Sequence, residues 1–162
     1  MIEIPLQSRS PVASDRAIRK EALHSAMING GISAAIFLAL FGSEDPLPIW
    51  GRGGLAIDTI VQAFMVAIMA TVVPVAIMRR KRRTSQIPVS PEASALPRSL
   101  VTRALLLGLV AAGLSAVLVL LVLTWTGIAT AGWYQAITAK IAFGALTGAA
   151  ATAAALRAEL AP

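Results

Sequence analysis

The 162-residue chain contains no cysteine and a single histidine, His24. Without cysteine it cannot form disulfides, use a catalytic thiol, ligate an iron–sulfur cluster or build a cysteine-based zinc site. One histidine excludes bis-histidine haem ligation within the chain and any metal centre that needs several imidazoles. We therefore predict no cofactor and no bound metal. Because no set of nucleophile, base and orienting group is recognisable either, we predict that the protein is not an enzyme.

Charged residues are also scarce, since they make up 14% of the chain whereas a soluble domain normally carries about 25%. Hydrophobic residues make up 57%, and the few charges are segregated, which leaves long uncharged stretches. This composition is typical of a membrane protein. The net charge of +6 arises from basic residues beside apolar stretches. Such clusters indicate membrane topology, and we predict no binding to nucleic acid.

Four apolar segments cover about residues 22–41, 55–78, 102–126 and 133–156. Each is about 20–25 residues long, or roughly 30–37 Å as a helix, which matches a hydrocarbon core of about 30 Å. Because backbone polar groups in lipid must bond within their own segment, each is predicted to be an α-helix. The predicted fold is an all-α integral membrane protein with four transmembrane helices. This domain, residues 18–157, follows a flexible cytoplasmic tail at residues 1–17.

The basic residues predict the orientation of these spans. The connection at residues 79–101 is rich in proline and serine after a basic start, whereas the first loop, residues 42–54, carries Glu44 and Asp45. By the positive-inside rule, the basic connection and both termini are predicted to be cytoplasmic, in the plasma membrane, the inner membrane of a bacterium. The basic start is predicted to anchor the topology and to attract anionic lipid headgroups. It consists of Arg79, Arg80, Lys81, Arg82 and Arg83.

A shift of 82 residues aligns the first two segments with the last two. Identical pairs under this shift include Gly31 with Gly113 and Ser33 with Ser115, and the same shift superposes Asp58 on Lys140. The pattern is consistent with two parallel helical-hairpin repeats, related by an axis along the membrane normal. Small and apolar residues also match by chance in membrane spans, so four unrelated segments are the alternative.

Asp58 and Lys140 are charges inside predicted spans. Asp58 lies about four residues into the second segment and Lys140 about seven residues into the fourth, so both are expected in the outer part of the bilayer. Intramembrane charges usually face the protein interior and pair. We therefore predict that Asp58 approaches Lys140, with Gln62 one turn further along the same face. Three interpretations stay open: a coupling pair for ions or protons, a structural ion pair, or a helix cap with a lysine reaching the surface.

Small residues mark predicted packing faces. Gly144 and Gly148 form a G-x-x-x-G motif in the fourth segment, on one face with Lys140 and Thr152. In a membrane helix this motif lets another backbone approach closely. Gly31 and Gly113 are predicted packing glycines of the first and third segments. The partner helix belongs either to the same chain or to another one.

The first segment carries a polar line at Ser25, Asn29 and Ser33, spaced four residues apart. Either these side chains bond to neighbouring helices or they form part of a substrate path. Together with the packing faces, the line favours a small non-catalytic accessory or scaffold subunit of a membrane assembly. Its expected partners are membrane lipids, including anionic headgroups, and another membrane protein or a second copy. The alternative is a small transporter or channel with a polar site around Asp58, Gln62 and Lys140.

Overall fold

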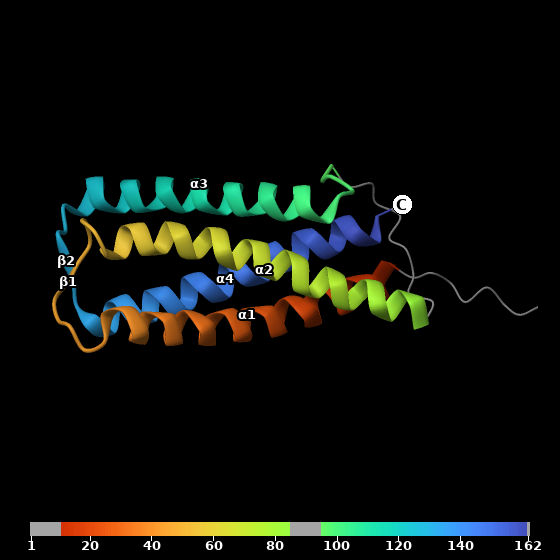
Figure 1. Ribbon diagram of the computed structural model, residues 1–162, viewed down its shortest axis with the longest axis horizontal. Helices are drawn as coiled ribbons and strands as arrows, with labels where there is room; N and C mark the ends of the chain where they lie inside the picture. Colours follow the sequence, from red (N-terminus) through yellow and green to blue (C-terminus); the bar gives the residue numbers. More distant parts are fainter. Residues whose placement is uncertain (1–10, 85–94, 162) are drawn as a thin grey trace, which may run out of the picture.

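The computed structural model describes residues 11–84 and 95–161. Its elements in chain order are α1 (Pro11–Phe41), β1 (Leu47–Pro48), α2 (Leu55–Thr84), α3 (Leu100–Thr126), β2 (Thr130–Ala131) and α4 (Trp133–Leu160) (Figure 1). All four helices are long and apolar enough to cross a membrane. The prediction of an all-α fold with four such helices is therefore confirmed. The first ten residues of the predicted tail, residues 85–94 of the predicted basic connection, and the side chains of Lys81, Arg82 and Arg83 lie outside the described residues.

The helix ends agree with the predicted spans at one end of the molecule and differ at the other. At the end formed by residues 42–54 and 127–132, here called the hairpin end, the helices stop and start at residues 41, 55, 126 and 133, as predicted. Gly42 and Gly127 follow the two helix ends there with φ of 54° and 63°, the left-handed conformation that glycine adopts most easily. The opposite end, where α1 begins and α4 ends, is here called the terminal end.

At the terminal end the helices run further than predicted. α1 begins at Pro11, so residues 11–17 of the predicted tail are helical, and α2 continues to Thr84 through the basic residues. Proline is well suited to a first helical position, and lysine and arginine are good helix formers. Hydropathy predicts where the apolar segment ends. The helix can extend beyond that point until a helix-breaking residue ends it.

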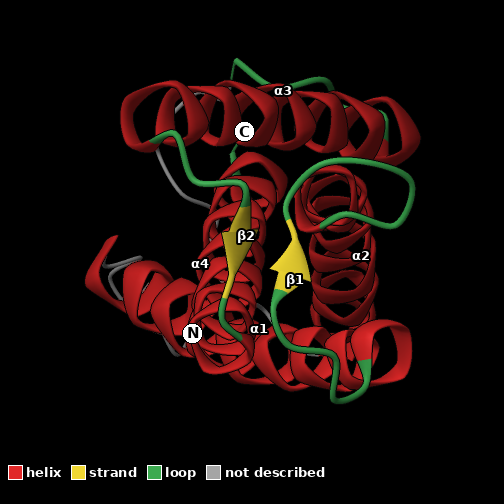
Figure 2. Cartoon of the chain, turned by 90° about the vertical axis from the view of Figure 1, so that its left-hand side faces the viewer, coloured by secondary structure: helices red, strands yellow, loops and turns green. Residues whose placement is uncertain are grey.

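The helices are arranged around a central pair. α2 and α4 lie side by side, and α1 and α3 lie on opposite sides of that pair (Figure 2). α1 packs mainly on α4, and α3 packs mainly on α2, whereas α1 with α2 and α3 with α4 share few contacts. Each helix therefore finds its main partner in the other half of the chain rather than in its own hairpin.

The hairpin end is closed by contacts between its two loops. β1 and β2 form a short antiparallel pair in which Pro48 lies opposite Thr130. The Trp133 backbone N–H, at the start of α4, donates to Asp45 Oδ1 at 3.1 Å, and the Trp133 indole Nε1 donates to the Gly42 carbonyl at 2.7 Å. A carboxylate at a helix N-terminus is favoured by the helix dipole. The first loop thus holds the beginning of the last helix.

The terminal end is joined by an ionic cluster. Glu159 of α4 accepts two hydrogen bonds from Arg79 of α2, at 2.8 and 3.0 Å, and one from Arg103 of α3 at 3.2 Å. Arg103 is buried and also donates to the Ala155 carbonyl at 3.1 Å. Arg79, a predicted headgroup anchor, therefore takes part in an ion pair within the chain, and both Arg79 and Arg80 are exposed.

Candidate functional site

The structure brings Asp58 and Lys140 into direct contact. Lys140 Nζ donates to Asp58 Oδ2 between α2 and α4, where the two side chains are 4% and 14% exposed for lysine and aspartate respectively. The Asp58 backbone N–H bonds to the Gly54 carbonyl, so Asp58 lies within the helical ladder rather than at the cap position. Lys140 is buried and does not extend to the molecular surface. Of the three interpretations left open by the sequence, the helix cap with an outward lysine does not describe this geometry.

A line of buried polar side chains runs from this pair towards the terminal end, between α1, α2 and α4. We call it the polar column. It consists of Gln62, Ser33, Asn29, Ser25 and Thr152.

The members of the polar column bond to one another and to the backbone. Gln62 Nε2 donates to Ser33 Oγ, Ser33 Oγ donates to the Asn29 carbonyl at 2.6 Å, and Asn29 Nδ2 donates to the Ser25 carbonyl at 2.8 Å. Ser25 Oγ donates to the Gly148 carbonyl at 3.1 Å. Thr152 Oγ1 lies 2.8 Å from Ser25 Oγ and 2.9 Å from the Ala70 carbonyl. These hydrogen bonds therefore connect α1 and α2 to α4.

Gly144 and Gly148 form the surface of α4 on which the polar column packs. A Cβ atom at Gly144 would lie 1.9 Å from Ser33 Oγ, and one at Gly148 would lie 2.6 Å from Asn29 Nδ2. Neither distance is possible unless Ser33 or Asn29 moves away from α4. The G-x-x-x-G motif thus serves contact within the chain, which answers the question that its sequence left open.

Gly31 and Gly113, the predicted packing glycines of the first and third segments, do not pack against another helix of this chain. Both glycines are exposed, and a Cβ at either would meet nothing within 4 Å. The glycines that pack in α1 and α3 are Gly30, which faces Ile141 and Ala145, and Gly108, which faces Phe64 and Ile68. Successive helix residues are rotated by about 100°, so Gly31 points away from the face that carries Gly30 and the polar line.

Two features distinguish this region from an ordinary packed core. Gln62 is 6% exposed, and its Oε1 atom has no hydrogen-bond partner among the described residues. A cavity of about 320 Å³ lies beside the ion pair at the hairpin end, and Thr59, Gln135 and Lys140 are among its lining residues. The first feature is a buried acceptor without a hydrogen bond, and the second places the Lys140 side chain at the edge of a cavity.

Sequence reasoning missed the role of Arg103. This residue lies one position inside the predicted third span, and its guanidinium is one of the most buried charges of the described chain. The signal was present, because Glu159 lies just beyond the end of the fourth span with the opposite charge. Two opposite charges at matching depth near one membrane face predict a pair, by the reasoning applied to Asp58 and Lys140.

Within the described part of the chain, no three histidine, aspartate or glutamate side chains gather into a group that could hold a metal ion. Comparison of the chain with protein-family models, with curated proteins and with solved structures finds no match. The contacts and cavities themselves are therefore the basis for assigning a function.

Proposed function

We propose that the protein is a non-catalytic integral membrane protein, an accessory or scaffold subunit of a plasma-membrane assembly with both termini in the cytoplasm. One observation carries the proposal: the polar side chains of the helices are used for packing within the chain. Gly144 touches Ser33 and Gly148 touches Asn29, so the polar column packs directly against α4. A transport pathway needs polar groups that face water, whereas these groups lie 7% exposed or less.

The outward face of α1 offers a surface for a partner helix. Gly31, Ala35 and Ala39 follow one another at intervals of four residues, and all three are exposed. Small residues at this spacing allow a second membrane helix to approach closely. We propose that a partner membrane protein or a second copy packs here, with lipid around the remaining apolar surface and anionic headgroups near exposed Arg80.

The Gly31→Leu variant tests this surface. A Cβ atom at Gly31 meets no atom of the chain within 4 Å, so an exposed leucine there should leave folding intact while it blocks the approach of a partner. Gly113→Leu is the matched control, because Gly113 is equally open and lies on α3 among large side chains. We expect the parent and Gly113→Leu to retain bound partner or self-association after purification in mild detergent, and Gly31→Leu to lose it. A parent protein that purifies as a bare monomer would contradict the proposal.

We also propose that the two hairpins are repeats. Three contacts join residues that are 82 positions apart: Asp58 with Lys140, Thr152 with the Ala70 carbonyl, and Pro48 with Thr130. Residues that meet their own equivalents lie on a two-fold axis. The exchange of main partners, α1 with α4 and α3 with α2, follows the same symmetry. The axis then runs along the central pair, from the hairpin end to the terminal end.

A transporter is the second candidate, favoured by the cavity beside Lys140 and by the unpartnered Gln62 Oε1. In that case water reaches the ion pair from the hairpin end. Gln135→Cys, which lines the cavity, should then react with a membrane-impermeant thiol reagent, and Asp58→Asn should abolish an uptake or efflux activity of a properly folded protein. An unreactive Gln135→Cys would remove this candidate.

A further inference from the structure

The fold consists of two helical hairpins that complete each other. The first hairpin is α1 with α2, the second hairpin is α3 with α4, and the two helices of each hairpin share few contacts. α1 packs mainly on α4 and α3 packs mainly on α2, so the main helix contacts join one hairpin to the other (Figure 2). The surface between the hairpins is therefore a recognition surface, and its occupant in the structure is the opposite hairpin.

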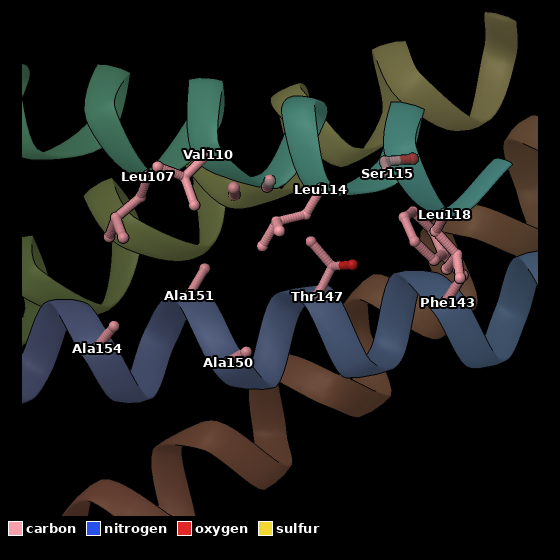
Figure 3. Close-up of a pocket in the computed structure, with 12 residues that line it drawn as sticks. Leu107, Val110, Leu114, Ser115, Leu118, Phe143, Thr147, Ala150, Ala151 and Ala154 are labelled. Carbon is pink, nitrogen blue, oxygen red and sulfur yellow. The ribbon is translucent and has the colours of Figure 1, made fainter. Parts of the chain in front are cut away.

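Neither hairpin packs tightly on its own. A cavity of about 160 Å³ in the first hairpin is lined by residues of α1 and α2. In the second hairpin, Leu114 of α3 and Thr147 of α4 point towards each other across a cavity of about 320 Å³ (Figure 3). Hydrogen bonds between the hairpins are closely made, since Ser25 Oγ donates to the Gly148 carbonyl at 3.1 Å. Each hairpin therefore depends on a complementary one for its packing.

Side-chain size determines which hairpin the first one accepts. Ser33 of α1 lies against Gly144 of α4, where a Cβ atom would overlap Ser33 Oγ. The shift of 82 residues relates Gly144 to Gln62 of α2. Under the proposed two-fold relation, two first hairpins would thus place Gln62 where the structure has room only for a glycine. Size therefore disfavours a pair of first hairpins.

Charge disfavours both kinds of like pair. Asp58 of the first hairpin contacts Lys140 of the second, and the shift of 82 residues makes these two positions equivalent. Two first hairpins would bring two Asp58 carboxylates together, and two second hairpins would bring two Lys140 ammonium groups together. Like charges at a buried contact suppress the wrong partner. Only a first hairpin with a second hairpin joins opposite charges.

We infer that each hairpin binds the complementary hairpin of a second copy of this chain through the contacts that it makes within its own chain, and that Asp58 with Lys140 selects the unlike pair. The link permits this exchange, because the 15 residues 85–99 join α2 to α3 and can span at most about 50 Å, whereas packed helices lie about 8–10 Å apart. The exclusion of like pairs rests on the proposed repeat. The inference does not involve the α1 face that carries Gly31.

Full-length charge variants test the exchange between chains. In the parent, the tethered hairpin has the higher effective concentration and occupies the surface first. Asp58→Lys brings two lysines to the contact and Lys140→Asp brings two aspartates, so neither variant forms the ion pair within its own chain. Together, the two variants restore opposite charges only by exchanging hairpins. We expect little folded protein from either variant alone and several-fold more from their co-expression, with the two affinity tags of the two chains in one particle.

The matched control is the reversed chain, Asp58→Lys with Lys140→Asp, which should fold within one chain because opposite charges again meet. All chains carry Gly31→Leu, and two differently tagged parent chains measure association through any other surface. No recovery on co-expression, while the reversed chain folds, would overturn the exchange between chains, and so would recovery without both tags in one particle. A reversed chain that folds as poorly as the single variants would overturn the selection by charge. Neither result depends on the scaffold role, because no other protein is needed.

Discussion

Asp58 and Lys140 stabilise the chain chiefly by neutralising each other. A charge that is buried loses the favourable free energy of its hydration. The attraction between the two charges offsets that cost only while both partners are present. Lys140 is the more buried of the two, so it depends more strongly on its partner. The sequence predicted this pair because opposite charge, similar depth and the shift of 82 residues agreed.

Removing one partner of this pair should therefore be worse than removing both. We expect Asp58→Asn and Lys140→Met each to lower the free energy of unfolding by about 1–3 kcal/mol, and the double variant to recover part of the loss. A double-mutant cycle on detergent-solubilised protein, unfolded by a denaturing detergent, measures the coupling. Additive single effects would show that the contact contributes nothing to stability.

Gly144 is a second position where one residue decides the packing. Gly144→Ala places a methyl group in the space that Ser33 Oγ occupies and should destabilise the fold by about 1–3 kcal/mol, the range for overpacking. Gly31→Ala is the matched control, because its methyl group meets nothing and alanine favours the helix. Unfolding of both variants under identical conditions tests the difference. If Gly144→Ala is as stable as Gly31→Ala, the contact between α1 and α4 is looser than described.

At the level of whole helices, the sequence predicted the helix boundaries at the hairpin end correctly and those at the terminal end incorrectly. Glycines and prolines outside the apolar segments stop a helix, so the boundaries at residues 41, 55, 126 and 133 could be predicted from the sequence. No such residue follows Met78 at once, and α2 continues to Thr84. The packing faces were harder, because the sequence places small residues on several sides of each helix. Gly30 and Gly31 differ by one position, and only the partner helix distinguishes them.

α3 should depend strongly on Arg103. Its guanidinium is among the few polar links between α3 and α4, since those two helices otherwise contact each other sparsely. Arg103→Met leaves the Ala155 carbonyl without this donor and should cost about 3 kcal/mol, at the low end for breaking a buried ion pair. Arg98→Met, an exposed arginine nearby, should change stability little.

Hydrogen exchange provides the readout for α3. In Arg103→Met, amides near the start of α3 should lose protection before those of α4, because the cluster fixes that end of the helix. Equal protection of α3 in Arg103→Met and Arg98→Met would assign its position to the apolar contacts with α2 alone.

The two ends of the helix bundle differ, so the orientation of the whole molecule in a membrane can be tested. Figure 1 shows the hairpin loops at one end and the described chain ends, near Pro11 and Ala161, at the other. If the terminal end is cytoplasmic, Ser43→Cys in the first loop should react with an impermeant thiol reagent on intact cells. Ala95→Cys, exposed near the start of α3, should react only after lysis. The chain has no cysteine of its own to interfere. The reverse labelling would invert the proposed orientation.

The pairing of α1 with α4 affects how the protein is made. A ribosome delivers the N-terminal half first, so in a chain inserted into the membrane as proposed, α1 and α2 arrive before α4 has been synthesised. Until then Ser25 lacks the Gly148 carbonyl and the Thr152 hydroxyl, and Asp58 lacks Lys140. On the proposed topology, the nascent hairpin holds an unneutralised carboxylate and a polar helix face in lipid, with few contacts between its own two helices. The speed of translation through residues 85–160 then sets how long the first hairpin waits for the partners of these groups.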